Sequence, residues 1–67
     1  MERLMVEYLR KRVEDVRLEI KALEEAFRRG ELSSEDYVNR YLALKDSIKV
    51  LQAELSRLGA VVEATNI

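Results

Sequence analysis

Apolar residues recur along this chain in two long series, and within each series the steps alternate between three and four residues. One series covers residues 6–27 and the other covers residues 37–62. This is the a/d spacing of helices that pack along a narrow seam, whereas a strand would alternate by two. The pattern therefore predicts two helices, over residues 2–29 and 34–58.

The break between the two series carries the signals that end one helix and begin another. Gly30 stands where the next seam residue would fall, and glycine accepts the left-handed conformation that closes a helix. Ser33 is the expected N-cap of the second helix, because its hydroxyl can accept a bond from a first-turn amide. Two helices of matched length around a loop over residues 30–33 predict an antiparallel hairpin.

The whole of residues 1–67 is expected to form one all-α domain. The segment after the second helix, residues 59–67, is expected to be a tail rich in β-branched residues, with Gly59 as a second candidate for closing a helix. Three conformations are considered for the tail, namely continuation of the helix, a frayed end, or packing along a neighbour. Val62 keeps the seam register, which favours continuation.

The residue types that are missing exclude several kinds of site. The chain has 67 residues and contains neither Cys nor His, so we expect no disulfide, no Cys/His metal centre and no histidine general base. No run of about 18 apolar residues is present to span a membrane. Charges interrupt the apolar residues at the start, unlike in a signal peptide. We expect a cytoplasmic protein without a cofactor.

Acidic pairs are candidates for general acid–base or metal chemistry, and they occur at residues 14–15, 24–25 and 35–36. Neighbours on a helix point about 100° apart, so no pair converges on one substrate atom. Neither apolar series contains Asp or Glu. Ser33 and Ser34 have no histidine to activate them as nucleophiles. We therefore expect no catalytic residue, no metal ligand and no enzymatic activity.

A single hairpin buries only one seam, and a chain this small leaves much of its surface in water. Small domains are usually reinforced by disulfides, metals or partners, and the first two are not expected here. We expect self-association into a four-helix bundle of coiled-coil type, as a homodimer with a homotetramer as the alternative. The oligomer interface is expected to comprise Val6, Leu9, Val13, Val16, Ile20, Leu23, Phe27, Tyr41, Leu44, Ile48, Leu51, Leu55 and Leu58.

A second set of apolar residues projects away from the seam. It is open to two interpretations, namely scattered surface residues, which are normal, or a second interface for a tetramer or a partner. The set comprises Leu4, Tyr8, Leu18, Ala22 and Ala26 on the first helix and Leu42 and Val50 on the second.

Three aromatic residues, Phe27, Tyr37 and Tyr41, gather at the loop end of the seam. Their spacing favours an aromatic cluster that closes this end of the bundle, with the tyrosine hydroxyls reaching solvent or a carbonyl. The alternative is a ligand pocket, which would need convergent polar groups that the sequence does not supply there.

Basic residues form a cluster on the first helix, at Arg10, Lys11, Arg12 and Arg17. Acidic residues interleave with them and the net charge of the chain is −1, whereas phosphate-binding surfaces usually carry uncompensated positive charge. Ion pairing along the helix surface is the simpler interpretation. The alternative is a small nucleic-acid-associated regulatory protein that uses these four residues as nucleic-acid contacts.

The stretch GELSSEDY over residues 30–37 resembles the short C-terminal helical domain known as SHOCT. That family reads Gly, any residue, an aliphatic residue, Ser or Thr, any residue, two acidic residues, and then Phe or Tyr. The resemblance implies an oligomerisation or docking element and carries no catalytic residue. The matching residues here are Gly30, Leu32, Ser33, Glu35, Asp36 and Tyr37.

The pattern, the composition and the resemblance lead to the same functional hypothesis. We expect a non-enzymatic helical oligomerisation or adaptor protein that acts through protein–protein contacts. Its expected partners are further copies of itself and a protein that the sequence does not identify.

Overall fold

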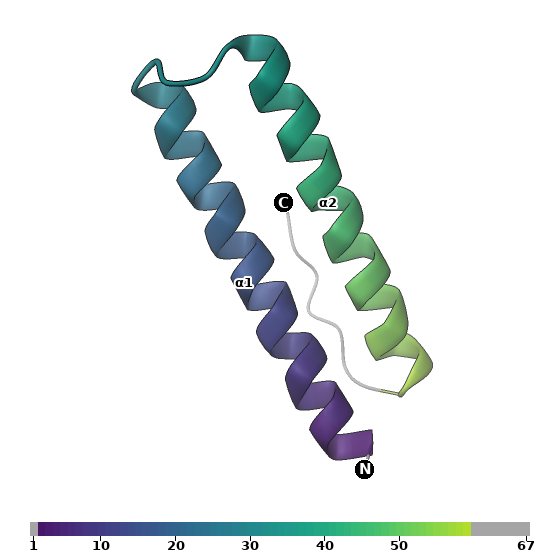
Figure 1. The fold of residues 1–67 in the computed structure, drawn as a ribbon. Helices are drawn as coiled ribbons and strands as arrows, with labels where there is room; N and C mark the ends of the chain where they lie inside the picture. The colour runs from purple at the N-terminus through teal and green to yellow at the C-terminus, as the bar shows by residue number, and fades with distance from the viewer. Residues whose placement is uncertain (1, 60–67) are drawn as a thin grey trace.

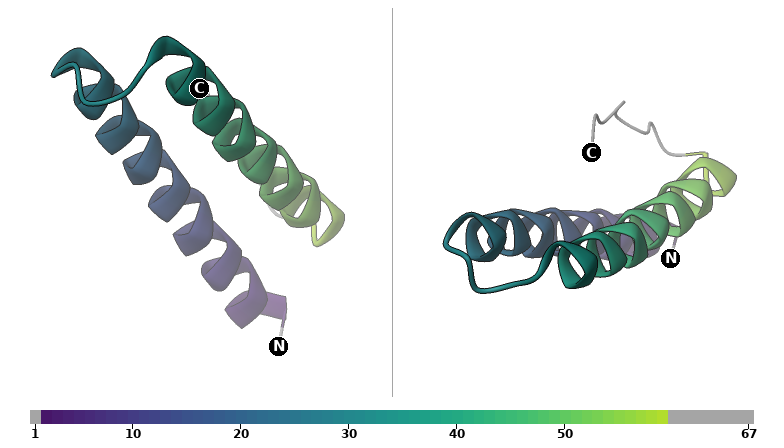
Figure 2. Two further views of the ribbon diagram at one scale, coloured as in Figure 1. Left: turned by 45° about the horizontal axis from the view of Figure 1, so that its top comes forward. Right: turned by 90° about the horizontal axis from the view of Figure 1, so that it is seen from above.

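Two helices, packed side by side and antiparallel, make up the fold (Figure 1). The computed structural model describes residues 2–59, with the side chain of Glu2 excepted. Helix α1 spans Glu2–Arg28 and helix α2 spans Ser34–Arg57. Seen along and across the hairpin, the pair forms a single layer (Figure 2). This confirms the predicted all-α hairpin, while residues 60–67 of the predicted tail lie outside the described residues.

Helix α1 ends in a Schellman motif centred on Gly30. Gly30 has a φ of 78°, and its amide donates to the Phe27 carbonyl at 3.0 Å. The Glu31 amide donates to the Ala26 carbonyl at 2.9 Å. This pair of bonds satisfies carbonyls that a helix end leaves without partners. Glycine therefore has the closing position that the sequence predicts for it.

Both helices end one residue earlier than the predicted boundaries at 29 and 58. The amides of Arg29 and Leu58 still donate to carbonyls four residues back, at 3.0 and 3.1 Å. Each of these residues is a C-cap, which keeps the last hydrogen bond but stands half outside the helix. Gly59 then has a φ of 78° and closes α2 as Gly30 closes α1.

Helix α2 begins at a serine cap. Ser33 has an extended backbone, with φ −70° and ψ 159°, and its hydroxyl accepts a hydrogen bond from the Asp36 amide at 3.1 Å. Glu35 and Asp36 lie in the first turn, where the positive end of the helix dipole stabilises negative charge. The N-cap predicted from the sequence is confirmed.

Removal of this cap should weaken the hairpin measurably. We expect Ser33→Ala to lower the free energy of unfolding by about 1 kcal/mol, because the Asp36 amide loses its acceptor. Urea titration followed by circular dichroism would measure the change. Ser34→Ala is the matched control, since Ser34 is the first residue of α2 and does not cap it. Equal destabilisation by the two variants would contradict the capping role.

The core lies between the two helices and consists of two neighbouring clusters. Leu51 packs against both of them, so the clusters form one continuous seam. Every member is at most 7% exposed, and full burial of such a side chain contributes about 1.5–3 kcal/mol. The clusters are Leu9, Val13 and Leu55 near the chain ends, and Val16, Ile20 and Ile48 nearer the loop.

The two helices contribute unequally to this core. Of the seven buried hydrophobic residues in the described range, α1 supplies five and α2 supplies only Ile48 and Leu55. The remaining residues of the predicted seam stay partly in water, because one neighbouring helix cannot surround them. These less buried residues are Val6 and Phe27 on α1, Tyr41, Leu44 and Leu51 on α2, and the C-cap residue Leu58.

Candidate interaction surface

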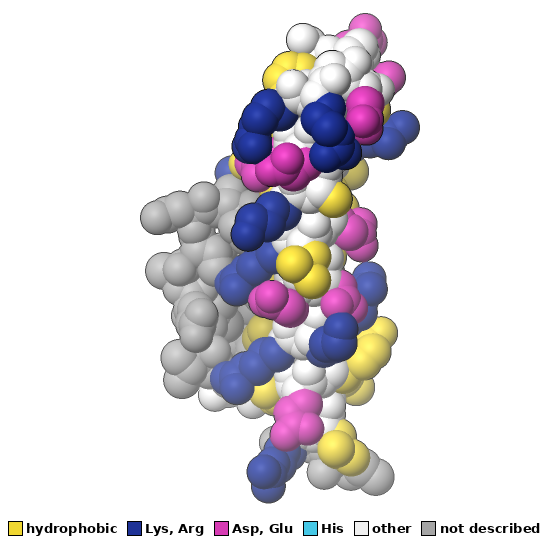
Figure 3. All heavy atoms as spheres, turned by 90° about the vertical axis from the view of Figure 1, so that its left-hand side faces the viewer, with side chains coloured by type: hydrophobic (Ala, Val, Ile, Leu, Met, Phe, Trp, Pro, Cys, Tyr) yellow, Lys and Arg dark blue, Asp and Glu magenta, His cyan; other side chains and the backbone are white. Residues whose placement is uncertain are grey.

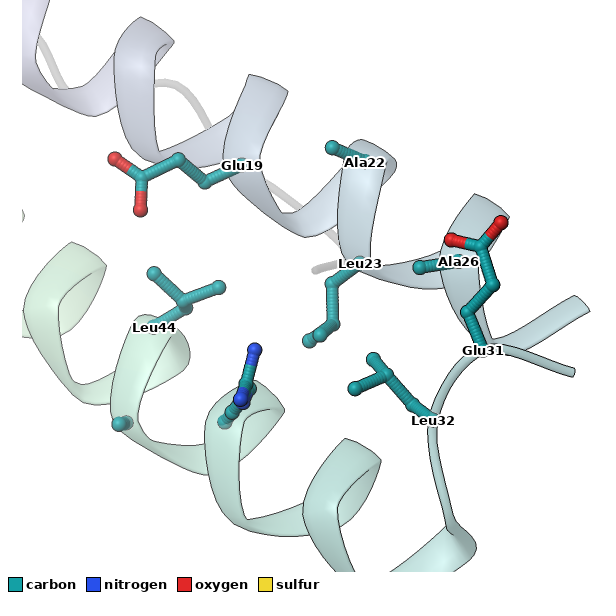
Figure 4. Close-up of a pocket in the computed structure, with 9 residues that line it drawn as sticks. Glu19, Ala22, Leu23, Ala26, Glu31, Leu32 and Leu44 are labelled. Atoms are coloured by element: carbon teal, nitrogen blue, oxygen red, sulfur yellow. The ribbon is translucent and has the colours of Figure 1, made fainter. Parts of the chain in front are cut away.

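A hollow opens between the helices close to the loop (Figure 4). Leu23 of α1, Leu44 of α2 and Leu32 of the loop point into it, so its floor is apolar. Three of the nine lining residues are alanines, whose small side chains leave space between the helices. The lining is completed by Glu19, Ala22, Ala26, Glu31, Arg40 and Ala43.

A second hollow lies on the same side of the hairpin, closer to the chain ends. Arg12 lines it from α1, and Ser47, Val50 and Leu51 are among the residues that line it from α2. Residues seven apart lie on one stripe of a helix. Arg12 is seven residues before Glu19. On α2, the three residues that line the first hollow, Arg40, Ala43 and Leu44, are each followed seven residues later by one that lines the second, namely Ser47, Val50 and Leu51.

The two hollows therefore belong to one side of the molecule, which we call the groove face. Steps of seven extend its α1 stripes to Met5 and Tyr8, which are 51% and 60% exposed. Val50 of α2 is 64% exposed on the same face. The groove face comprises Met5, Tyr8, Arg12, Asp15, Glu19, Ala22, Ala26, Glu31, Leu32, Arg40, Ala43, Asp46, Ser47 and Val50.

The floor of the groove face is the edge of the seam itself. Leu23 and Leu44 line the first hollow and Leu51 lines the second. Leu44 and Leu51 are only half-buried in the hairpin. A partner that covers the groove face would therefore complete the burial of residues that already belong to the core.

Charges on the groove face are few and mostly without partners in the hairpin. Within the described range, Arg12, Glu19 and Arg40 form no ion pair. Asp15 and Glu31 are the exceptions, because Asp15 pairs with Lys11 at 2.6 Å and Arg29 Nε donates to the Glu31 carboxylate at 2.9 Å. The hydrogen bond and the charge of Arg29 lower the pKa of Glu31, so this rim of the hollow stays anionic at neutral pH.

The outward side of α1 differs from the groove face. Lys and Arg side chains alternate along it with Asp and Glu, and its hydrophobic side chains stand apart from one another (Figure 3). Ion pairs at helical spacing join several of these charges, such as Arg28 with Glu25 at 2.9 Å, and Lys11 reaches Asp15 at the border of the groove face at 2.6 Å. Such exposed pairs contribute little to stability, so this side is mainly a solvated surface.

The four basic residues considered as nucleic-acid contacts do not form one patch. Consecutive helical residues point about 100° apart, so Arg10, Lys11 and Arg12 face three different directions. Arg12 lines the groove face, while Lys11 is paired with Asp15 on α1. Arg17 lies 4.0 Å from Glu14. The geometry does not supply the concentrated positive surface that phosphate binding needs.

The aromatic residues at the loop end stack on one another. The ring centroids of Phe27 and Tyr37 are 4.4 Å apart and those of Tyr37 and Tyr41 are 5.9 Å apart. The Lys45 ammonium lies 5.6 Å from the centre of the Tyr41 ring. This confirms the predicted aromatic cluster. Its rings fill the end of the seam by contact with one another, and none of them lines either hollow.

The second apolar set predicted from the sequence divides between different sides. Ala22 and Ala26 line the first hollow and Val50 lines the second. Tyr8 lies on the same stripe of α1 as Ala22. Leu4, Leu18 and Leu42 are 67%, 56% and 55% exposed and line neither hollow. Part of the set therefore lies on the groove face, and the rest is scattered over other sides of the hairpin.

Apart from Val50, the α2 and loop residues of the groove face were not anticipated from the sequence. Arg40, Ala43 and Ser47 were not singled out, although the seven-residue spacing of Ala43 and Val50 was available as a signal. Leu32 belongs to the loop, so no helical periodicity points to its position in the hollow.

Over residues 2–59, no three acidic side chains come together in a way that would hold a metal ion. Neither described helix contains an apolar stretch of the length that crossing a bilayer requires. Comparison of the chain with protein-family models, with curated proteins and with solved structures finds no match.

Proposed function

We propose that this protein is a small, non-enzymatic oligomerisation or adaptor module that acts through protein–protein contacts. The observation that carries the proposal is the groove face, where half-buried core leucines form the floor of an open hollow between two helices. An apolar hollow with small side chains on its walls is suited to receive another protein surface. A four-helix bundle is the simplest assembly that would cover it.

The energetics of so small a fold support the same function. Only seven hydrophobic residues of the described range are buried, all of them along one seam. Small chains without disulfides or metals commonly gain stability from association. A second hairpin on the groove face would bury Leu44 and Leu51 fully. Full burial of such a side chain from water contributes about 1.5–3 kcal/mol, and these two half-buried residues would gain part of that.

The resemblance of residues 30–37 to SHOCT domains supports this proposal, because it implies an oligomerisation or docking element. The resembling segment forms the loop and the first turn of α2. It includes Leu32, which points into the first hollow (Figure 4). The alternative function as a nucleic-acid-associated protein gains no support from the arrangement of its four basic residues.

Sedimentation equilibrium over a concentration series, with helicity followed by circular dichroism, tests the proposal. We expect a mass near twice the 7.8 kDa of one chain, with dissociation and loss of helicity on dilution. A fully helical species of 7.8 kDa at every concentration would contradict the proposed association.

A matched pair of serine variants identifies the surface used. Ser47 lines the groove face, whereas Ser56 lies nine residues further along α2, which is half a turn away on the opposite side. We expect Ser47→Lys to lower the mass to that of one chain at concentrations where wild type and Ser56→Lys remain associated. Equal masses for the two variants would exclude the groove face as the contact surface.

A further inference from the structure

We propose that the groove face binds the groove face of a second copy turned end for end, so that the two loops lie at opposite ends of a four-helix bundle. This inference rests on the proposed function and names the partner and its orientation. In such an arrangement a two-fold axis crosses the helices, and α1 of one copy lies antiparallel to α1 of the other.

The shape of the groove face favours this orientation. The hollow walled by Ala22 and Ala26 lies at the loop end, whereas the bulky, exposed side chains of Met5 and Tyr8 lie at the other end of the same stripes. End-for-end packing places the bulky end of each copy over the hollow of the other. Tyr8 then opposes Ala22, and Met5 opposes Ala26, so the helices keep an even separation.

The charges on α1 fit the same two-fold axis. Arg12 and Glu19 lie on one stripe, and within the described residues neither has an ion-pair partner. The midpoint between them, at position 15.5, lies half a residue from the midpoint between Tyr8 and Ala22, at position 15. The axis that places Tyr8 over the hollow therefore also places Arg12 of each copy opposite Glu19 of the other, twice per dimer.

Asp15 lies close to this axis and would face its own symmetry mate. Its carboxylate already has the Lys11 ammonium at 2.6 Å, which offsets the repulsion between the two copies. The hairpin measures 43 × 16 × 14 Å. One broad side offers on the order of 700 Å² in projection, near the roughly 800 Å² per partner that stable dimers bury.

The opposite choice, with both loops at the same end, fits the surface less well. It would place α1 of one copy over α2 of the other. Residues at the same distance from the loop end would then face each other. The hollow would then face another hollow, and Asp15 would face the apolar side chain of Val50. Arg12 would have Glu54 as its partner, although Glu54 is already paired with Arg57.

Charge reversal tests the orientation. Arg12→Glu should raise the dimer dissociation constant by about 10- to 100-fold, because like charges would oppose each other twice. Glu19→Arg should do the same, and the double variant R12E/E19R should return to within about threefold of wild type. Lys21→Glu is the control, since Lys21 lies nine residues from Arg12 on the opposite side of α1. Rescue by R12E/E54R in place of R12E/E19R would overturn the end-for-end arrangement.

Disulfide trapping supplies an independent geometric test, because the chain contains no cysteine. Positions 8 and 22 are about 21 Å apart within one helix, too far for a disulfide within one chain. Oxidised Y8C/A22C should form a covalent dimer, whereas Tyr8→Cys and Ala22→Cys alone should not. A dimeric Y8C/A22C variant that fails to cross-link would refute the orientation and leave the proposed function standing. A monomeric wild type would refute both.

Discussion

Ile20→Asp is expected to abolish the folded state and self-association together. Ile20 is 5% exposed and packs with Val16 and Ile48 in the cluster nearer the loop. A carboxylate at this position would be buried among apolar side chains without a partner. We expect the free energy of unfolding to fall by about 4 kcal/mol or more, which a hairpin with one seam cannot sustain. Circular dichroism should show loss of the helical signal, and sedimentation should show one chain.

The matched control for this variant is Leu18→Asp. Leu18 is two residues away on the same helix but is 56% exposed and lines neither hollow. The same carboxylate there stays in water, so we expect a change within about 1 kcal/mol and unchanged association. A fully helical, monomeric Ile20→Asp protein would show that the seam is not the core on which both folding and assembly depend.

Ile48→Ala is expected to have the second largest effect, by removal of volume without any charge. Ile48 is 3% exposed and supplies the α2 side of the cluster that contains Val16 and Ile20. Truncation of a buried isoleucine to alanine costs about 2–5 kcal/mol, from lost burial and from the cavity that remains. The upper part of this range is expected only if the two helices cannot close the gap. Urea unfolding would measure the change as a lower midpoint.

Leu42→Ala is the control for this truncation. Leu42 lies on α2 with 55% of its surface exposed, so its side chain leaves no cavity when shortened. We expect a change below about 1 kcal/mol. If the two variants were equally unstable, the α2 side of the seam would not be held by the packing around Ile48.

In the proposed assembly, folding and association would be linked, because they would use the same residues. Leu44 and Leu51 pack against the core clusters and also form part of the floor of the groove face. A substitution in the clusters should therefore weaken association even when it touches no partner residue. Conversely, association should raise the apparent stability as the protein concentration rises. Substitutions on the groove face that leave the seam intact separate the two effects.

Local signals explain how much of the fold could be predicted from the sequence. The a/d spacing places the buried residues on one stripe of each helix, since only that stripe can face a neighbouring helix along its whole length. Gly30 and Ser33 end one helix and begin the next through bonds to nearby backbone groups. These effects act over a few residues, so they are visible without the tertiary structure. The helix ends were misjudged by one residue because a C-cap keeps a helical hydrogen bond.

Part of the candidate surface could be anticipated in the same way. Ala22, Ala26 and Val50 stand out from the sequence as apolar residues away from the seam, and the structure places all three in the hollows. The sequence could not distinguish them from Leu18 and Leu42, which lie on other sides. Nor could it assign Arg12 to the groove face, because its neighbours Arg10 and Lys11 suggested a different role for it as part of a basic cluster.

By itself, the sequence determined the two helices, the hairpin loop and the stripe that forms the core, because periodicity, capping and glycine conformation are local properties. The tertiary structure alone decided which side of the hairpin is hollow. That side depends on how two stripes from different helices, together with Leu32 of the loop, meet across the seam. Small side chains beside the seam of each helix leave a gap only when they face each other. Which sides of the two helices face each other follows from the antiparallel packing of α1 against α2.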